Sequence, residues 1–202
     1  NSDLGKLIKI MSFNLKGKNK LVKDSLNALD KINSPYEILN CLTNEGKFLF
    51  ERAEKLLKEY NGLLEEAKSK VNNDELLLFI YPEADNSFTS DLAGELAYLY
   101  KNKIIIVGRK KENRIVMSLR SRKKPIVKIL EKALVGINGY GGGHKLACGA
   151  SVSIDDFDIF ISRFPGRDIH ERQIIIDSLV VNNAFYCSRL KEGFYFRSKE
   201  KI

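Results

Sequence analysis

The stretch that decides the fold is Gly139-Tyr140-Gly141-Gly142-Gly143-His144-Lys145-Leu146-Ala147-Cys148-Gly149-Ala150. Glycine has no Cβ, so three in succession permit positive φ and let a ligand approach the backbone closely. Such a segment exposes several N–H groups to an anion, and a hydrogen-bond donor, His144, and a cation, Lys145, follow at once. The pattern predicts a phosphate-binding glycine loop over residues 136–143. The alternative is a glycine hairpin that only turns the chain.

Strands and helices alternate on both sides of this segment. Apolar runs of strand length predict strands at Glu75–Tyr81, Lys103–Arg109, Arg114–Arg120 and Ala147–Ile154. Helical patterns lie at Ser87–Tyr100, Pro125–Val135 and Asp155–Phe164, the last with Asp155 as its expected cap. The second and third strands are joined by a predicted turn at residues 110–113 and are expected to form a hairpin with one wet, basic face. The order predicts an α/β fold, a mixed sheet flanked by helices.

The N-terminal part has a different, purely helical pattern. Residues 1–45 are expected to form short helices, and Ser34-Pro35-Tyr36-Glu37 has the sequence of a capping box with proline at the first helical position. Residues 45–70 are expected to form one long helix, which is a connecting helix rather than a coiled coil because the repeat is short. Its apolar stripe comprises Leu49, Ala53, Leu56, Tyr60, Leu63 and Ala67.

The basic excess of the chain is concentrated in one segment. The 202 residues carry a formal charge of +8. Between Lys101 and Lys128 there are eleven Lys or Arg residues against one acidic residue, Glu112. This segment alone carries the whole positive excess, which favours a polyanionic partner, with nucleic acid first. A solvated lysine-rich surface is the alternative.

Other features exclude several classes of protein. Three distant cysteines, Cys41, Cys148 and Cys187, with only two histidines encode neither a disulfide framework nor a zinc site, which favours a reducing, cytoplasmic compartment. No apolar run approaches the roughly 20 residues of a membrane span, so no membrane partner is expected. Because the chain begins at Asn1, we expect it to be part of a longer protein.

Two motifs identify a resemblance to a known family. Gly141-Gly142-Gly143-His144, followed by Ala147, Gly149 and Ala150, resembles the GGGH-x-x-A-x-G-A signature of the DHHA1 domain, the C-terminal substrate-binding domain of the DHH phosphoesterase superfamily. Ser118-Leu119-Arg120-Ser121 resembles a second family feature, a strand ending in Ser-Leu-Arg-Ser. The resemblance covers roughly residues 46–164. Length and basic character are similar to those of RecJ-like single-strand nucleases of the archaeal type.

The resemblance implies a division of the chain into four parts. Residues 1–45 resemble the end of a catalytic DHH domain, 46–72 form the connecting helix, and 73–164 form a DHHA1-like nucleic-acid-binding domain. Residues 165–202 are a C-terminal extension without an assigned role, in which a helix or strand around Ile174–Val181 and an aromatic run at Phe194–Phe196 are expected.

The resemblance also implies a site for the phosphate backbone of single-stranded DNA or RNA. The expected nucleic-acid and phosphate-binding residues are Gly141, Gly142, Gly143, His144, Lys145, Ser118, Arg120, Arg109, Arg122, Lys123 and Tyr140. His144 and the backbone of Gly142 and Gly143 would hold one phosphate, and Ser118 and Arg120 the next. Tyr140 is expected either to stack on a base or to serve as a packing residue.

The same resemblance implies that this chain does not contain the catalytic residues of the family. Family chemistry needs a manganese cluster in the DHH domain, and this chain contains no Asp-His-His triplet. The carboxylates of Asp155-Asp156-Phe157-Asp158 lie at a helix start, where capping is favoured over metal binding, and His170 is isolated. We therefore expect no catalytic residue, metal or cofactor in this chain, which alone is expected to hydrolyse nothing, and Mn²⁺ only in an absent DHH domain.

Three functions remain open from the sequence. The first is single-strand binding by the DHHA1 half of a RecJ-like exonuclease acting in DNA replication or repair. The second is a non-catalytic RecJ-like accessory module of the replication fork that binds GINS. The third is the DHHA1 half of a phosphodiesterase for oligoribonucleotides or cyclic dinucleotides.

Overall fold

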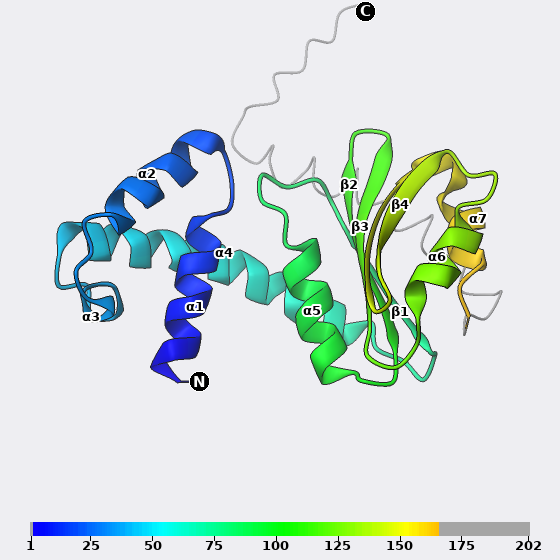
Figure 1. The fold of residues 1–202 in the computed structure, drawn as a ribbon, viewed down its shortest axis with the longest axis horizontal. Helices are drawn as coiled ribbons and strands as arrows, with labels where there is room; N and C mark the ends of the chain where they lie inside the picture. The colour runs from blue at the N-terminus through cyan, green and yellow to red at the C-terminus, as the bar shows by residue number, and fades with distance from the viewer. Residues whose placement is uncertain (1, 166–202) are drawn as a thin grey trace, which may run out of the picture.

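In the computed structural model, residues 2–165 are described. The expectations for Ile174–Val181 and Phe194–Phe196 lie outside these residues, as do those for His170 and Cys187. The described part consists of a helical segment, a long helix and a sheet with its own flanking helices (Figure 1). This order confirms the predicted α/β class.

The helical segment contains three helices, α1 (Asp3–Asn14), α2 (Asn19–Leu29) and α3 (Pro35–Leu39). The predicted capping box is present at α3, where the Ser34 hydroxyl accepts from Tyr36 N–H and the Glu37 carboxylate accepts from Ser34 N–H. The long helix α4 spans Asn44–Ser69. Its buried stripe agrees with the prediction except at one position, because Leu64 rather than Leu63 is buried.

Within residues 2–165 the sheet has five strands, in the order β1-β2-β3-β5-β4. The strands are β1 (Leu76–Tyr81), β2 (Ile104–Lys111), β3 (Arg114–Ser121), β4 (Gly139–His144) and β5 (Ala147–Ser153). The β1–β2 pair is parallel and the other pairs are antiparallel. Helix α5 (Thr89–Leu99) crosses from β1 to β2, while α6 (Ile126–Ala133) and α7 (Phe157–Ser162) follow β3 and β5.

Helices cover the two faces of the sheet unequally. On one face, Ile106, Leu119 and Val152 pack against α6 and α7 in one hydrophobic cluster. On the other face, Ile105 and Val107 pack beneath α5 and the end of α4. Figure 1 shows α5 and α4 on one side of the strands and α6 and α7 on the opposite side. Over β4 and the nearby part of β5 this second face is open, since Gly149, Gly142, His144 and Tyr140 are exposed, whereas Ser151 and Ser153 are buried.

The glycine segment forms a strand, which corrects the predicted loop over residues 136–143. Residues 139–144 pair with β5 in a regular antiparallel register and form one edge of the sheet. Glycine is depleted in strands because it has no side chain to pack, so pairing with β5, a tertiary interaction, sets the conformation. The turn predicted at residues 110–113 is also shorter, since only Glu112 and Asn113 lie outside the strands.

Asp155 does not cap the last helix as predicted. A short 3₁₀ turn, Ile154–Asp156, precedes α7, and Asp156 occupies the cap position without a side-chain capping bond. The Asp156 carboxylate instead accepts a hydrogen bond from Asn138 N–H at 2.7 Å. The carboxylate therefore fixes the start of β4.

Candidate functional site

The sheet register places the key predicted side chains on one face. Directly opposed residues of neighbouring strands share a face. Arg120 on β3 lies opposite Ala147 on β5, which lies opposite His144 on β4. These residues form a first row across the open part of the sheet, and Arg120 and His144 are at its two ends.

A second row contains almost no side-chain atoms. Ser118 lies opposite Gly149, and Gly149 lies opposite Gly142. A Cβ built at Gly142 has no neighbouring atom within 4 Å, and one at Gly149 meets only Met117 O at 3.7 Å. Both glycines are exposed. The surface between β3 and the sheet edge is therefore a strip of bare backbone that a ligand can approach closely.

The other two glycines of the motif serve the fold. A Cβ on Gly141 would lie 2.8 Å from Gly149 O, and one on Gly143 would clash with Ala147 O. Gly143 also has a φ of +148°, a backbone conformation that residues with a Cβ rarely adopt. The glycines therefore divide into a bare ligand-facing position, Gly142, and two positions that let β4 lie against β5.

The edge of β4 presents backbone donors. Ser153 N–H donates to Asn138 O, which makes this a hydrogen-bonded pair of the antiparallel ladder. Because such pairs alternate, Gly142 N–H points toward β5, whereas the N–H groups of Gly141 and Gly143 point away from it. These two amides lie on the outer edge of β4, the strand that ends at the exposed His144.

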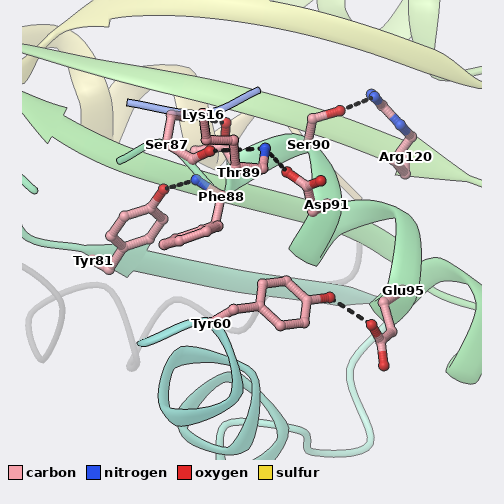
Figure 2. Close-up of polar contacts among 10 residues, drawn as sticks. All are labelled: Lys16, Tyr60, Tyr81, Ser87, Phe88, Thr89, Ser90, Asp91, Glu95 and Arg120. Carbon is pink, nitrogen blue, oxygen red and sulfur yellow. Dashed lines mark hydrogen bonds and ion pairs between the residues drawn. The ribbon is translucent and has the colours of Figure 1, made fainter. Parts of the chain in front are cut away.

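The Arg120 side chain is fixed beside α5. Its Nη1 donates to the carbonyl oxygens of Leu119 and Cys148, at 2.9 and 3.1 Å, and its Nη2 donates to Ser90 Oγ at 3.0 Å. Figure 2 shows this last contact at the start of α5. No residue of the described chain accepts a hydrogen bond from Arg120 Nε. The guanidinium is thus oriented by the protein and retains donors for a ligand.

The start of α5 is itself anchored. Tyr81 Oη accepts from Phe88 N–H at 2.9 Å, and Lys16 Nζ forms an ion pair with Asp91 at 2.7 Å (Figure 2). Farther along α5, Glu95 Oε2 accepts a hydrogen bond at 2.5 Å from the hydroxyl of Tyr60, which lies on α4. The helix that orients Arg120 is therefore tied to β1, to the α1–α2 connection and to α4.

The remaining predicted basic residues lie at the periphery of the site. Arg109 is half-buried, and its Nη1 donates to Ala84 O at 2.8 Å. Its Nε is buried with no hydrogen-bond partner in the described chain. Arg122 and Lys123 are exposed in the β3–α6 connection, and Lys145 is exposed in the β4–β5 turn. These cations lie on three different elements, β2, the β3–α6 connection and the β4–β5 turn.

The predicted wet face of the β2–β3 hairpin is narrower than expected. Ser118 is only 9% exposed, and Ile105 and Val107 on the same face are fully buried. Helix α5 contributes this cover, since it packs against β2 and β3. The open surface therefore starts at β3 and extends over β5 and β4 rather than over the hairpin.

Sequence reasoning missed four residues around the site. Arg114 lies on the face of Arg120 and its guanidinium is 5.5 Å from the centroid of the Tyr140 ring. Ser90 orients Arg120, and Tyr98 lies beneath both Arg122 and Lys101, each 5.8 Å from its ring centroid. Arg114 was detectable by its even spacing from Arg120 along one strand. The contacts of Ser90, Tyr98 and Lys101 depend on how α5 packs.

The described residues contain no cluster that could hold a metal ion, and their buried cysteine is not activated. Within residues 2–165, no three His, Cys, Asp or Glu side chains gather in an arrangement that can hold a metal ion. Burial raises the pKa of the Cys148 thiol, which donates to His144 O at 3.3 Å, so this cysteine stays protonated. No helix in this part of the chain is long and apolar enough to cross a membrane.

Comparisons with known proteins identify the sheet domain. Residues 73–165 match the family model of the DHHA1 domain. A comparison with curated protein sequences finds no match.

Several solved structures are similar to this chain. The C-Ala domain of Aquifex aeolicus alanyl-tRNA synthetase is 16% identical, with a TM-score of 0.39 over 46% of this chain and 88% of that one. RecJ from Thermus thermophilus in complex with Mn²⁺ is 20% identical, with a TM-score of 0.46 over 72% of this chain and 24% of that one. The pGpG-specific phosphodiesterase PggH from Vibrio cholerae is 20% identical, with a TM-score of 0.40 over 66% and 51%.

This chain thus spans about a quarter of that RecJ and about half of that phosphodiesterase. The match to the family model covers all five strands and both predicted motifs, Ser118-Leu119-Arg120-Ser121 and Gly141-Gly142-Gly143-His144. Residues 73–165 of this chain are therefore a DHHA1 domain, a domain of the DHH superfamily.

Proposed function

We propose that the DHHA1 domain binds the sugar-phosphate backbone of single-stranded nucleic acid across β3, β5 and β4. The observation that supports this most directly is the shared open face of Arg120 and His144, with the bare strip of Gly142 and Gly149 beside them. A strand that crosses this strip meets cationic and neutral donors and no side chain that blocks it.

Each group has a distinct part in this proposal. Arg120 donates to phosphate oxygens by charge-assisted hydrogen bonds, and its orientation by Ser90 lowers the entropy lost on binding. The imidazole of His144 donates one hydrogen bond. The outward N–H groups of Gly141 and Gly143 add neutral donors at the sheet edge, as in other anion-binding backbone segments. Contacts of this kind position a strand but read no sequence.

The finer assignment is also a proposal. The resemblance in motifs and the basic segment support the DHHA1 half of a RecJ-like exonuclease of the archaeal type, cytoplasmic and acting in replication or repair. In this proposal the chain binds and does not hydrolyse, and Mn²⁺ belongs to the DHH domain. GINS is the protein partner that the RecJ-like resemblance suggests.

Salt dependence of oligonucleotide binding tests the proposed function. We expect a fluorescein-labelled oligothymidylate of about twelve nucleotides to bind saturably in fluorescence anisotropy. If Arg120, Arg109, Arg122, Lys123 and Lys145 each meet a phosphate, log K falls against log salt with a slope of roughly −3.5, since single strands release about 0.7 counterion per contact.

Point variants assign the binding to the site. Arg120→Lys, which keeps the charge but loses the planar fork, and His144→Ala are expected to weaken binding while the circular dichroism spectrum stays that of the wild type. Lys47→Ala on α4 is the control, because it removes one exposed positive charge far from the open face. Unchanged affinity in both site variants would overturn the assignment.

The same titrations distinguish single-strand binding from the two other functions that the sequence left open. A phosphodiesterase half for small substrates would bind a dinucleotide as tightly as a long strand. A protein-docking module would show no saturable binding to any oligonucleotide.

A further inference from the structure

Tyr140 is an exposed aromatic side chain on the face of the proposed site. It is 70% exposed, and no other large apolar side chain within the described strands is exposed. Its register partner on β5 is Ser151, which lies opposite Val116 on β3. This is the row next to the bare strip, on the side away from Arg120 and His144.

Arg114 holds this part of the surface in place. Its Nε donates to Ser151 Oγ and its Nη2 to Ser151 O, both at 2.9 Å. Weaker contacts at 3.4 Å reach the side chain and carbonyl oxygen of Asn138. The guanidinium carbon lies 5.5 Å from the Tyr140 ring centroid. A cation at this distance from an aromatic ring attracts it, so Arg114 restrains Tyr140.

The hydrogen bonds of Arg114 decide which ligand group fits here. Nε, Nη1 and Nη2 each donate to a protein oxygen already, so few donors remain for a phosphate. The exposed surface is instead a tyrosine ring backed by a planar cation. Aromatic rings of this kind stack on bases of any sequence. The chemistry at Tyr140 therefore complements that at Arg120, which suits a phosphate.

The distance between Tyr140 and His144 along β4 sets a minimum length for a ligand that contacts both residues. Tyr140 and His144 are four residues apart on β4, which is about 13 Å along a strand. Stacked nucleotides advance about 3.4 Å each, so about four of them cover this distance, and an extended strand needs fewer. One nucleotide advances a strand by less than this distance, so a strand that runs along β4 needs about three nucleotides or more to meet both places.

We propose that Tyr140, restrained by Arg114, is a base-stacking subsite on the path of the strand that Arg120 and His144 bind, and that both places are occupied only by strands of about three nucleotides or more. This inference rests on the proposed function. It adds a minimum length of the ligand, and it identifies Arg114 as a positioning residue that restrains the Tyr140 ring.

A tryptophan reporter tests the subsite directly. The chain contains no tryptophan, so Tyr140→Trp places the sole indole at the subsite. Oligothymidylates with a 5′-phosphate, from one to about six nucleotides long, are titrated against this variant. We expect little quenching by the mononucleotide and dinucleotide, and strong quenching from three or four nucleotides onward. Equal quenching at every length would overturn the proposed spacing.

Affinity measured over the same length series gives the second test. The wild type is expected to gain about tenfold in affinity when the strand becomes long enough, on the scale of one stacked base. Tyr140→Ala should lose this gain and still bind the dinucleotide like the wild type, whereas Tyr140→Phe should keep it. Arg114→Lys should lose most of the gain, because lysine cannot make the same planar contacts. Tyr36→Ala on α3, an exposed tyrosine outside the sheet, is the matched control.

The outcomes distinguish the two proposals. If Tyr140→Ala binds every length like the wild type while Arg120→Lys loses affinity, the subsite is wrong and the proposed function stands. If Tyr140→Ala weakens all lengths equally, the inferred separation is wrong. If neither the wild type nor any variant binds oligonucleotides, both proposals fail.

Discussion

Arg120 and Ser90 join the third strand of the sheet to the first turn of α5 through a 3.0 Å hydrogen bond from Nη2 to Oγ. Ser90 is exposed, so this bond contributes little to stability and acts mainly on the orientation of the guanidinium. We predict that Ser90→Ala weakens oligonucleotide binding about threefold to tenfold while unfolding free energy changes by less than about 1 kcal/mol. Anisotropy and urea unfolding measure the two effects. Ser87→Ala, in the loop before α5, is the control, and equal affinities of both variants would contradict the orienting role.

Four of the five glycines of β4 and β5 are expected to fall into two groups when each is replaced by alanine. Gly142→Ala and Gly149→Ala add a methyl group in open space, so the fold should be retained while the ligand is held away from the backbone. Gly141→Ala and Gly143→Ala place a Cβ against the backbone of β5 and are expected to cost about 1–3 kcal/mol. Thermal unfolding and oligonucleotide binding of the four variants separate the groups. Lost stability in the first pair, or none in the second, would contradict this division.

Ionisation of the buried Tyr60 phenol is expected to make the stability of the folded protein decrease at alkaline pH. Burial, and next the hydrogen bond to Glu95, raise the pKa of this phenol above its ordinary value. The unfolded chain therefore ionises first, and above about pH 10 the folded protein loses up to roughly 1.4 kcal/mol per pH unit from this group. Tyr60→Phe should lower the free energy of unfolding by about 1 kcal/mol near neutral pH, because the hydrogen bond to Glu95 is lost. As the pH rises further, the free energy of unfolding of this variant should fall less steeply than that of the wild type.

Urea unfolding at several pH values measures both effects. Tyr36→Phe is the control because Tyr36 is exposed. Parallel curves for wild type and Tyr60→Phe above pH 10 would contradict the predicted linkage.

Asn14 is a buried polar residue on which the helical segment depends. Its side chain is inaccessible to solvent and donates to Ile10 O and Leu49 O, at 2.9 and 2.8 Å, while accepting from Ser25 Oγ. Asn14→Ala removes these three buried hydrogen bonds at once, so we expect the free energy of unfolding to fall by about 2–3 kcal/mol. Asn27→Ala on the exposed surface of α2 should change stability by less than about 0.5 kcal/mol. Similar losses in both variants, measured by chemical denaturation, would contradict this role.

Features that depend on neighbouring residues in the chain were predictable from the sequence. The capping box at Ser34 and Glu37 is such a feature, and so is the apolar stripe of α4, which is wrong only at Leu63. The alternation along β3 correctly put Ser118 and Arg120 on one face. In each case the determining contacts lie within about one or two turns or strand repeats of the residue.

Features that depend on distant residues were not predictable. The glycine segment 139–144 has the composition of a loop and becomes a strand only because β5 pairs with it. Asp156 binds Asn138 at the start of β4 instead of capping its own helix. The contacts of Arg120 with Ser90 and of Arg122 with Tyr98 both require α5 in its folded position. The sequence thus predicted that Ser118 and Arg120 share a face of the sheet, but it did not predict the residues that orient Arg120 and Arg122.

The glycine-rich composition of β4 also bears on self-association. An edge strand offers unpaired backbone groups that can template a strand of another molecule, and such pairing is favoured when apolar side chains become buried with it. Four of the six β4 residues are glycine, so a second copy docking there would cover little apolar surface apart from the Tyr140 ring. The edge can therefore keep its amides accessible to a ligand without promoting aggregation.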